Sequence, residues 1–323
     1  MVDRSASVIK LGSWDFHPIG LADIDMYAEF IKATEYPANL WSSNFAYLWA
    51  SSQSRLRKVL WREIDGMLVT FGHSHKNSLY LFCLPFGAGD SQKLTKVMTQ
   101  CMQYCLEWNK RENDRTLVRM INQHQLEYLR ECPEFDLTYR PVTLKGIERH
   151  FAVKKLVALS GKDFGNIRNR INKFNRENRN VVIRRYRPDD YQSVMELGRQ
   201  WSAQAGQKYP VIFDQVYYPA IIERSAELKQ LVLVMESGKQ IIGLIAGGEL
   251  PTGQAWGSLL KYLDRLPGLS ETLTVEFARE LNRINPAVEL LNVGSDLGQG
   301  GLRDYKLKFR PVLNLKRYQL YLK

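Results

Sequence analysis

The sequence lacks the segments that direct export or membrane insertion. Its first thirty residues contain no charged start followed by an apolar run and a small-residue cleavage site, so they do not form a signal peptide. The longest apolar runs, QLVLVM and IIGLIAGG, have the length of a strand and fall far short of the roughly 20 residues that a bilayer span needs. We therefore expect a cytoplasmic chain without a transmembrane segment.

Cysteine and histidine are scarce, with four and five residues in a chain of 323. Cys101 and Cys105 stand four apart, but no second pair at metal-ligand spacing accompanies them. The two histidines of GHSH at 72–75 also lack a nearby third ligand. We expect the cysteines to be reduced thiols in the core, and we expect no metal site.

Positive charge is abundant, and it is concentrated in one stretch. The chain has 45 lysines and arginines against 34 acidic residues, which gives a formal net charge of +11. Nine basic residues but only two acidic ones lie between Lys162 and Arg187. Such a local excess indicates a site for an anionic partner rather than a generally cationic surface.

Hydrophobic periodicity predicts a mixed pattern of helices and strands that runs twice along the chain. In the first half we predict helices at 22–33, 41–51, 90–109 and 123–131, and strands at 57–64, 67–73, 78–86, 116–121 and 135–140. In the second half we predict helices at 163–177, 188–205, 214–226, 269–284 and 300–308, and strands at 180–187, 230–236, 240–250, 254–263, 288–294 and 312–322.

Each half therefore shows helices, a three-strand meander, a helix and a strand. This order suits the Gcn5-related N-acetyltransferase (GNAT) fold, in which a central mixed sheet splays open to admit an acyl donor. We expect an α+β chain of two tandem GNAT-like domains, each a splayed mixed β-sheet flanked by helices. The proline and glycine of RPVTLKG favour a boundary there, which gives domains 1–150 and 151–323.

The helix predicted at 163–177 has an apolar stripe and a basic face. The stripe recurs at spacings of three and four and consists of Phe164, Ile167, Ile171 and Phe174. The opposite side carries Lys162, Arg168, Lys173, Arg176 and Arg179, with Asn169 and Asn172 among them. A solvated surface would also look like this, but surface helices usually mix charges of both signs. The one-signed face favours a polyanion: RNA phosphates, phospholipid headgroups or a phosphopantetheine nucleotide.

A second distinctive stretch is LNVGSDLGQGGLRDYKLKFRPV at 291–312. A strand ends here, a glycine-rich turn follows, and a short basic helix begins. Backbone N–H groups at such a turn and helix start can cradle an anion. The alternative is a simple turn that joins the last helix to the last strand.

Three segments resemble one known family. LSGKDFGNIRNRINKF, YLDRLPGLSETLTVEFAREL and DLGQGGLRDYKLKFRPV are similar to the bacterial family named for the C-terminal domain of lysyl-phosphatidylglycerol synthase, also catalogued as a domain of unknown function. The resemblance extends loosely from about residue 15 to the end. It implies a tandem GNAT fold related to Fem-type aminoacyltransferases, which move an amino acid from aminoacyl-tRNA to an amine or a lipid hydroxyl.

The resemblance and the basic helix together predict the residues that bind the donor or its phosphates. These are Lys162, Arg168, Asn169, Asn172, Lys173, Arg176, Asn292, Gly298 and Gly301.

The chemistry expected from these residues needs no covalent enzyme intermediate. The sequence has no Gly-x-Ser-x-Gly, and no cysteine adjoins a histidine. Direct attack of an acceptor on a bound ester needs positioning and donors for the oxyanion. Lys306 or Arg303 could stabilise the oxyanion or the leaving 3′-oxygen, and Asp296 is the candidate base. Four aromatic residues on the expected acceptor side are either core residues or stacking platforms: Trp201, Tyr209, Tyr217 and Tyr218.

Three functions remain open. The first is an aminoacyltransferase that uses aminoacyl-tRNA as a co-substrate, binds no cofactor tightly, and contacts tRNA or an anionic phospholipid headgroup, with a peripheral contact at the inner face of the membrane. The second is an acyl-CoA-dependent N-acyltransferase, although the place of the usual pyrophosphate loop, LDRLPGLSETL, offers only Gly268 and a proline. The third is a non-catalytic module that binds phosphate or a membrane surface.

Overall fold

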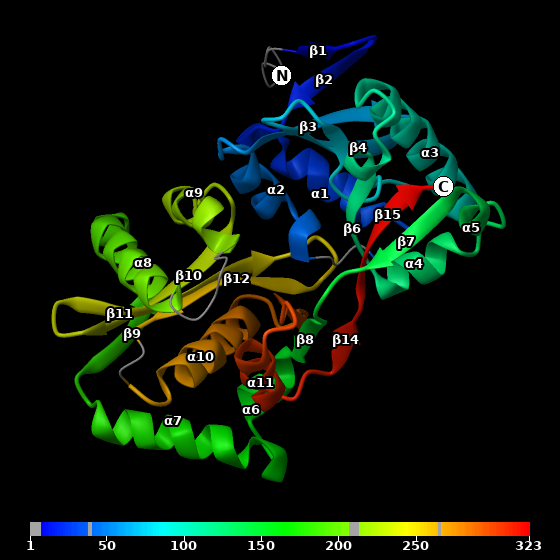
Figure 1. Cartoon of the computed structure of the whole chain (residues 1–323). Helices are drawn as coiled ribbons and strands as arrows, with labels where there is room; N and C mark the ends of the chain where they lie inside the picture. The colour runs from blue at the N-terminus through cyan, green and yellow to red at the C-terminus, as the bar shows by residue number, and fades with distance from the viewer. Residues whose placement is uncertain (1–7, 38–40, 207–212, 264–265) are drawn as a thin grey trace. The chain divides into compact units, whose positions relative to one another are not determined.

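The computed structural model describes residues 8–37, 41–206, 213–263 and 266–323, and it divides into two compact units. The first unit comprises residues 1–146 and 315–323, and the second comprises residues 147–314. Each unit contains one mixed β-sheet with helices packed on it (Figure 1).

The first unit contains an eight-stranded sheet in the order β1-β2-β3-β4-β5-β6-β15-β7. Its strands are β1 (Ile9–Leu11), β2 (Trp14–Pro18), β3 (Arg57–Ile64), β4 (Met67–Ser74), β5 (Leu79–Leu81), β6 (Leu117–Asn122), β7 (Tyr139–Thr143) and β15 (Arg317–Leu322). Its helices are α1 (Ile24–Lys32), α2 (Phe45–Ser52), α3 (Ser91–Trp108), α4 (Gln123–Leu129) and α5 (Phe135–Thr138).

The second unit contains a seven-stranded sheet in the order β14-β8-β13-β12-β11-β10-β9. Its strands are β8 (Glu148–Ala152), β9 (Val181–Arg185), β10 (Gln230–Ser237), β11 (Gln240–Glu249), β12 (Ala255–Tyr262), β13 (Leu290–Ser295) and β14 (Leu313–Leu315). Its helices are α6 (Val153–Ala158), α7 (Gly165–Glu177), α8 (Tyr191–Gly206), α9 (Tyr218–Glu223), α10 (Leu269–Ile284) and α11 (Gly300–Lys308). In Figure 1, α8 and α9 lie on one face of this sheet and α10 lies on the other.

Each sheet is completed by a strand from the other half of the chain. The C-terminal β15 lies between β6 and β7 in the first sheet, where Tyr318 pairs with both Ile121 and Thr143. In the second sheet β8, which follows β7 along the chain, lies between β13 and β14. The two units are therefore 1–146 with 315–323 and 147–314, not the expected 1–150 and 151–323, because the last strand pairs with the first unit.

The segment FDLTYR, predicted as a strand, begins as a helical turn. Phe135–Thr138 form α5, and only Tyr139 opens β7. Phe135 and Tyr139 stack at a ring-centroid distance of 5.3 Å, which is a contact typical of helical spacing. Leu137 between them is 77% exposed, so the alternation that suggested a strand does not correspond to a buried face.

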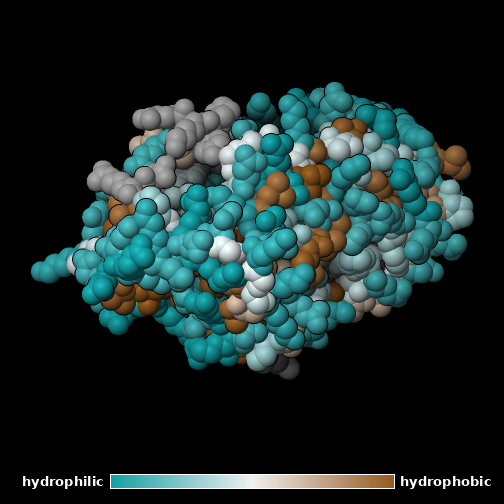
Figure 2. Space-filling view, turned by 90° about the horizontal axis from the view of Figure 1, so that it is seen from below, coloured by the Kyte–Doolittle hydropathy of each residue, from teal (hydrophilic) through white to brown (hydrophobic). Residues whose placement is uncertain are grey.

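The apolar side chains that give the sequence its periodicity form the cores of the two units. All four cysteines are free and buried, as expected, and burial raises the pKa of the Cys83 thiol to about 12. Hydrophilic residues cover most of the face seen in Figure 2, with hydrophobic residues between them in several places.

Candidate functional site

The second sheet splays open between β12 and β13. These two strands run parallel, but they pair only at Ala255 with Leu291 and at Trp256 with Asn292. The β12–β13 register ends at this second pair, whereas β12 runs on to Tyr262 and β13 runs on to Ser295. The sheet therefore opens toward the C-terminal ends of both strands, where the glycine-rich stretch begins.

Lys306 lies at this opening, and its ammonium is fully engaged. It comes from α11, is only 6% exposed, and donates to the carbonyl oxygens of Val293, Gly294 and Ser295 at 2.6, 3.0 and 2.8 Å. These carbonyls belong to the part of β13 that no longer pairs with β12. An ammonium has three N–H donors, and these three carbonyls use all of them. The geometry therefore favours a structural role for Lys306, which bonds β13 where β12 no longer pairs with it, over the expected contact with an oxyanion.

Asp296 is similarly engaged in the loop after β13. Its carboxylate accepts from the backbone amides of Ile147 and Gly298 and forms an ion pair with Arg149 at 2.8 Å. Burial alone would raise the pKa of Asp296, but Arg149 and the two amides outweigh burial and hold the pKa below its usual value. A carboxylate held in this way is a weak base, so the geometry favours a role in fixing the loop.

The pKa of Asp296 predicts a pH-dependent stability. Because its folded-state pKa is depressed, its contribution is complete above the unfolded-state pKa of about 3.9 and is lost as the pH falls through the folded-state value. Asp296→Asn should lower the free energy of unfolding by about 1.5–3 kcal/mol at neutral pH. Urea unfolding of both proteins should show that difference shrinking below pH ~4. A difference that is the same at every pH would contradict the assignment.

The basic helix α7 forms as predicted. Its apolar stripe is buried, with Phe164, Ile167, Ile171 and Phe174 exposed by 6% or less. The charged side chains do not all serve one purpose. Arg168 donates to the carbonyls of Leu159 and Gly161 and so fixes the turn that precedes the helix.

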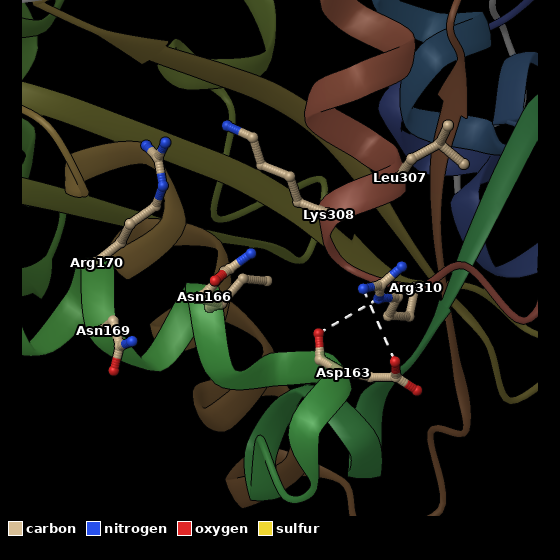
Figure 3. A pocket seen from close by; sticks show the side chains of 8 residues that line it. Asp163, Asn166, Asn169, Arg170, Leu307, Lys308 and Arg310 are labelled. Carbon is tan, nitrogen blue, oxygen red and sulfur yellow. Dashed lines mark hydrogen bonds and ion pairs between the residues drawn. The ribbon is translucent and has the colours of Figure 1, made fainter.

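A pocket of about 620 Å³ lies between α7 and the end of α11, so the basic helix and the C-terminal motif meet there. Its lining residues are Asp163, Asn166, Ile167, Asn169, Arg170, Leu307, Lys308 and Arg310. In Figure 3, Arg170, Asn166 and Lys308 point into a common space, whereas the side chain of Asn169 points away from it. Arg310 at the rim donates to the carbonyl of Asp163 and lies 3.8 Å from its carboxylate.

Two of the pocket's cations converge on one buried carboxylate. Glu271, in the first turn of α10, has a side chain that is 3% exposed. Its Oε1 lies 3.4 Å from Arg170 and 3.2 Å from Lys308, and Ser270 donates to its Oε2. Arg170 and Lys308 remain half and two-fifths exposed, so each can still meet a ligand.

The start of α10 is closed by α7. Gly268, just before the helix, has φ +96°, and a Cβ there would lie 2.6 Å from the carbonyl oxygen of Arg170. The first residues of α10, from Leu269 to Thr274, are all buried. The backbone amides at this end are thus covered, and the helix dipole already has a carboxylate partner in Glu271. Asp264 and Arg265 of the preceding loop lie outside the described residues.

The structure distributes the nine predicted donor-binding residues widely. Asn169 belongs to the pocket lining, and Lys162, Asn172, Lys173 and Arg176 are exposed on or beside α7 without lining it. Asn292 is fully buried and donates to Glu148 at 2.8 Å. Gly298 has φ +71°, and its backbone N–H donates to the Asp296 carboxylate, so this glycine serves the turn. Gly301 is exposed in the first turn of α11.

Arg303, the third predicted catalytic residue, is 56% exposed and lies 3.4 Å from Asp304 on the same helix. The sequence interpretation missed Arg170, Lys308, Arg310 and Glu271 as a set. Arg170 was in the basic stretch. Helical spacing was the available signal, because it places the side chains of Arg168 and Arg170 about 200° apart around the helix and so on different faces. The aromatic Tyr209 lies outside the described residues, whereas Tyr217 and Tyr218 are buried.

The two mixed sheets, the second of them open between β12 and β13, define the class of protein: a tandem GNAT-fold protein. A tandem GNAT protein from the clavulanic acid biosynthesis pathway has 8% sequence identity and a TM-score of 0.53, over 95% of this chain and 98% of that one. The predicted fold class is confirmed.

Two other solved structures are more similar. A conserved protein of unknown function from Bacteroides thetaiotaomicron has 21% identity and a TM-score of 0.81, over 95% of this chain and 99% of that one. L-PGS from Bacillus licheniformis has 17% identity and a TM-score of 0.64, over 92% and 91%. At such identities the likeness concerns the fold alone.

The family model for the C-terminal part of phosphatidylglycerol lysyltransferase matches residues 38–321. The chain belongs to this family, and the resemblance stated from the three sequence segments is confirmed. Family and fold are those of transferases of the lysyl-phosphatidylglycerol synthase and GNAT types. No curated protein matches the sequence.

Two kinds of feature are absent from the described part of the chain. Among those residues, no group of three histidine, cysteine or acidic side chains is placed to hold a metal ion. Within the same residues, no helix has both the length and the apolar character needed to cross a bilayer.

Proposed function

We propose that the protein is an aminoacyltransferase that moves an amino acid from aminoacyl-tRNA to a lipid or amine acceptor. The observation that carries this proposal is the pocket in which Arg170 of α7 and Lys308 of α11 converge, with Arg310 at its rim. Three cations and the amide of Asn166 suit the phosphates and sugar hydroxyls at the end of a nucleic acid. Family membership supports the same reaction class.

The reaction requires no group on the protein to be acylated. The acceptor's nitrogen or oxygen attacks the ester carbonyl of the aminoacyl-tRNA and loses a proton. The bond from the carbonyl carbon to the tRNA 3′-oxygen breaks, and that oxygen gains a proton as the new amide or ester forms. The protein contributes by holding the donor's phosphates, aligning the ester, and stabilising the negative charge that develops on the carbonyl oxygen.

Charged tRNA fits the geometry better than coenzyme A does. An acyl-CoA donor bound in the usual GNAT manner places its pyrophosphate on free amides at the start of the helix that follows the splayed strand. Here that helix start is buried and carries Glu271, whose carboxylate would repel a pyrophosphate. The cations lie instead on α7 and α11, which flank this end of α10.

The surface beside the pocket supports a lipid acceptor. Leu307 and Val312 are 39% and 43% exposed, and the cationic Lys308 and Arg310 lie between them in the sequence. Apolar side chains beside lysine and arginine suit an anionic lipid surface, since the chains enter the interface while the cations meet headgroup phosphates. We therefore propose that the protein contacts the membrane peripherally at this edge.

A transfer assay tests the proposed function. Total tRNA charged with radiolabelled amino acids is incubated with the protein and with vesicles that contain phosphatidylglycerol, and label is then measured in the lipid and in soluble amines. We expect label to leave the tRNA for one of these acceptors. Label that stays on the tRNA, together with a thermal shift on adding an acyl-CoA, would favour the acyl-CoA-dependent N-acyltransferase instead. Vesicle binding without transfer of any kind would leave a non-catalytic binding module.

A further inference from the structure

A lysine ammonium is buried on the splayed strand of the second unit, far along the sequence from the phosphate pocket residues of α7 and α11. Lys261 lies on β12, paired with Leu244 of β11, and its side chain is only 1% exposed. It lies five residues beyond Trp256, the last residue of β12 that pairs with β13. Lys261 is thus on the part of the strand that borders the opening of the sheet.

The ammonium of Lys261 lies in a cage of three side chains. Its Nζ donates to Oδ2 of Asp214 at 2.9 Å and lies 3.6 Å from the ring centroid of Trp201 on α8. The ring of Tyr218, at the start of α9, lies 5.0 Å away. A carboxylate and two aromatic faces are the groups that hold a cation out of water. Trp201 and Tyr218 therefore have a definite role beyond filling the core.

Packing alone does not account for a lysine at this position. Leu259 and Leu263 precede and follow it by two residues, so the same side of the chain is otherwise apolar. Replacement of a buried ion pair by well-packed hydrophobic residues is often neutral or stabilising. Burial lowers the pKa of Lys261, an effect that Asp214 opposes. A leucine would avoid this desolvation, so the lysine indicates a function for its charge.

The carboxylate that holds Lys261 has a second, unused oxygen. Among the described residues, Oδ1 of Asp214 is buried and accepts no hydrogen bond. A buried carboxylate oxygen without a donor is costly, and it marks a place where a ligand's N–H or O–H would be stabilised. The Lys261–Asp214 pair therefore offers a fixed cation and an adjacent vacant acceptor.

We propose that Lys261 is a catalytic residue whose ammonium stabilises the oxyanion of the acyl transfer, and that Asp214 holds it in place. This inference rests on the proposed function. When the acceptor attacks the ester, the carbonyl oxygen becomes negative, and a fixed ammonium beside it lowers the energy of that state. The oxyanion then re-forms the carbonyl double bond as the bond to the tRNA 3′-oxygen breaks, and that oxygen takes up a proton. Because the cage excludes water and needs no rearrangement, the effect of the charge is large.

The charge of Lys261 should give the reaction an alkaline limit. The titratable groups that face the ammonium are Asp214 and Tyr218, and Tyr186 and Tyr191 lie near Tyr218. Burial raises the pKa of Tyr218, so its hydroxyl stays neutral where Lys261 begins to lose its proton. Activity should be complete below the pKa of Lys261, which is itself lowered, and should fall as the pH rises through it.

Single-turnover transfer from charged tRNA, measured from neutral to alkaline pH, tests the assignment. Lys261→Met should lower the transfer rate about 10²–10³-fold with little change in the affinity for charged tRNA. Lys261→Arg should restore much of the rate and remove the alkaline limit, because a guanidinium stays charged.

Lys261→Met combined with Asp214→Asn leaves no buried unpaired charge. It should melt close to the wild-type temperature and yet be as slow as Lys261→Met. Lys239→Met, at an exposed turn of the same sheet, is the matched control and should transfer at the wild-type rate.

The outcomes separate this inference from the proposed function. A wild-type protein that transfers no amino acid overturns the proposed function and this assignment with it. An active wild type with an equally active double variant overturns only the assignment of Lys261. If the loss of activity at alkaline pH persists unchanged in Lys261→Arg, the assignment of Lys261 is also overturned. A residue that acts only through packing would leave the pH profile unchanged.

Discussion

Replacement of Lys306 by methionine should lower the free energy of unfolding by at least about 3 kcal/mol, because three buried or half-buried carbonyl groups lose their donor at roughly 1–3 kcal/mol each. The carbonyls of Val293, Gly294 and Ser295 lie beyond the last register pair of β12 with β13, so that ladder offers no donor in place of the ammonium. Methionine fills a similar volume but donates no hydrogen bond. Chemical denaturation followed by tryptophan fluorescence measures the loss.

Arg303→Met is the matched control for this prediction. Arg303 lies on the same helix, one turn before Lys306, but it is 56% exposed and pairs with the exposed Asp304. Its replacement should change the stability by no more than about 0.5 kcal/mol. Similar small losses for both variants would show that the β13 carbonyls do not depend on Lys306.

Removal of the two pocket cations should raise the KM for charged tRNA about 100-fold, at about tenfold or 1.4 kcal/mol for each phosphate contact. Arg170 and Lys308 both pair with Glu271, so removing them alone would leave a buried carboxylate without a partner. The variant therefore combines Arg170→Ala and Lys308→Ala with Glu271→Gln, which keeps the shape of the side chain and removes its charge. Steady-state transfer measured against tRNA concentration gives the KM.

Two further proteins define what that change means. Glu271→Gln alone should bind charged tRNA more tightly than the wild type, because it releases Arg170 and Lys308 from competition with a carboxylate. Lys154→Ala removes an exposed cation of α6 outside the pocket and should leave KM unchanged. A triple variant with the wild-type KM would show that the donor is bound elsewhere.

Local patterns in the sequence predicted the elements well where side chains bury one face. The apolar stripe of α7 occurs where periodicity placed it, because it is buried. The strand RKVLWREI also forms as predicted, with Val59 and Leu60 both buried at its centre. FDLTYR misled because a short apolar alternation fits a helical turn equally well when Phe135 and Tyr139 stack across it.

The non-local features could not be predicted from local patterns. The pairing of β15 with β6 and β7 joins residues almost two hundred positions apart, and no local signal specifies it. The charged residues of the glycine-rich motif show the same limit. Lys306 and Lys308 are two residues apart on α11, which is about 200° around the helix. One is buried against carbonyls and the other faces the pocket. Sequence identifies such residues as important without distinguishing support of the fold from contact with a ligand.

The same limit applies to Lys261. In the sequence it is a lysine within an apolar strand, QAWGSLLKYL, and it attracts no attention beside the basic stretch at 162–187. Only the fold brings Asp214 and Trp201 to its ammonium, from segments 47 and 60 residues away. A charged residue in the centre of an apolar strand was the available signal, since lysine is rarely buried without a partner.

The most direct test of the account is the salt dependence of charged-tRNA binding by the wild type and by the triple variant of Arg170, Lys308 and Glu271. We predict that the logarithm of the binding constant falls with the logarithm of salt concentration for both proteins, and that the slope for the variant is smaller by about two phosphate contacts. Equal affinities and equal slopes would contradict the claim that the α7–α11 pocket holds the donor's phosphates.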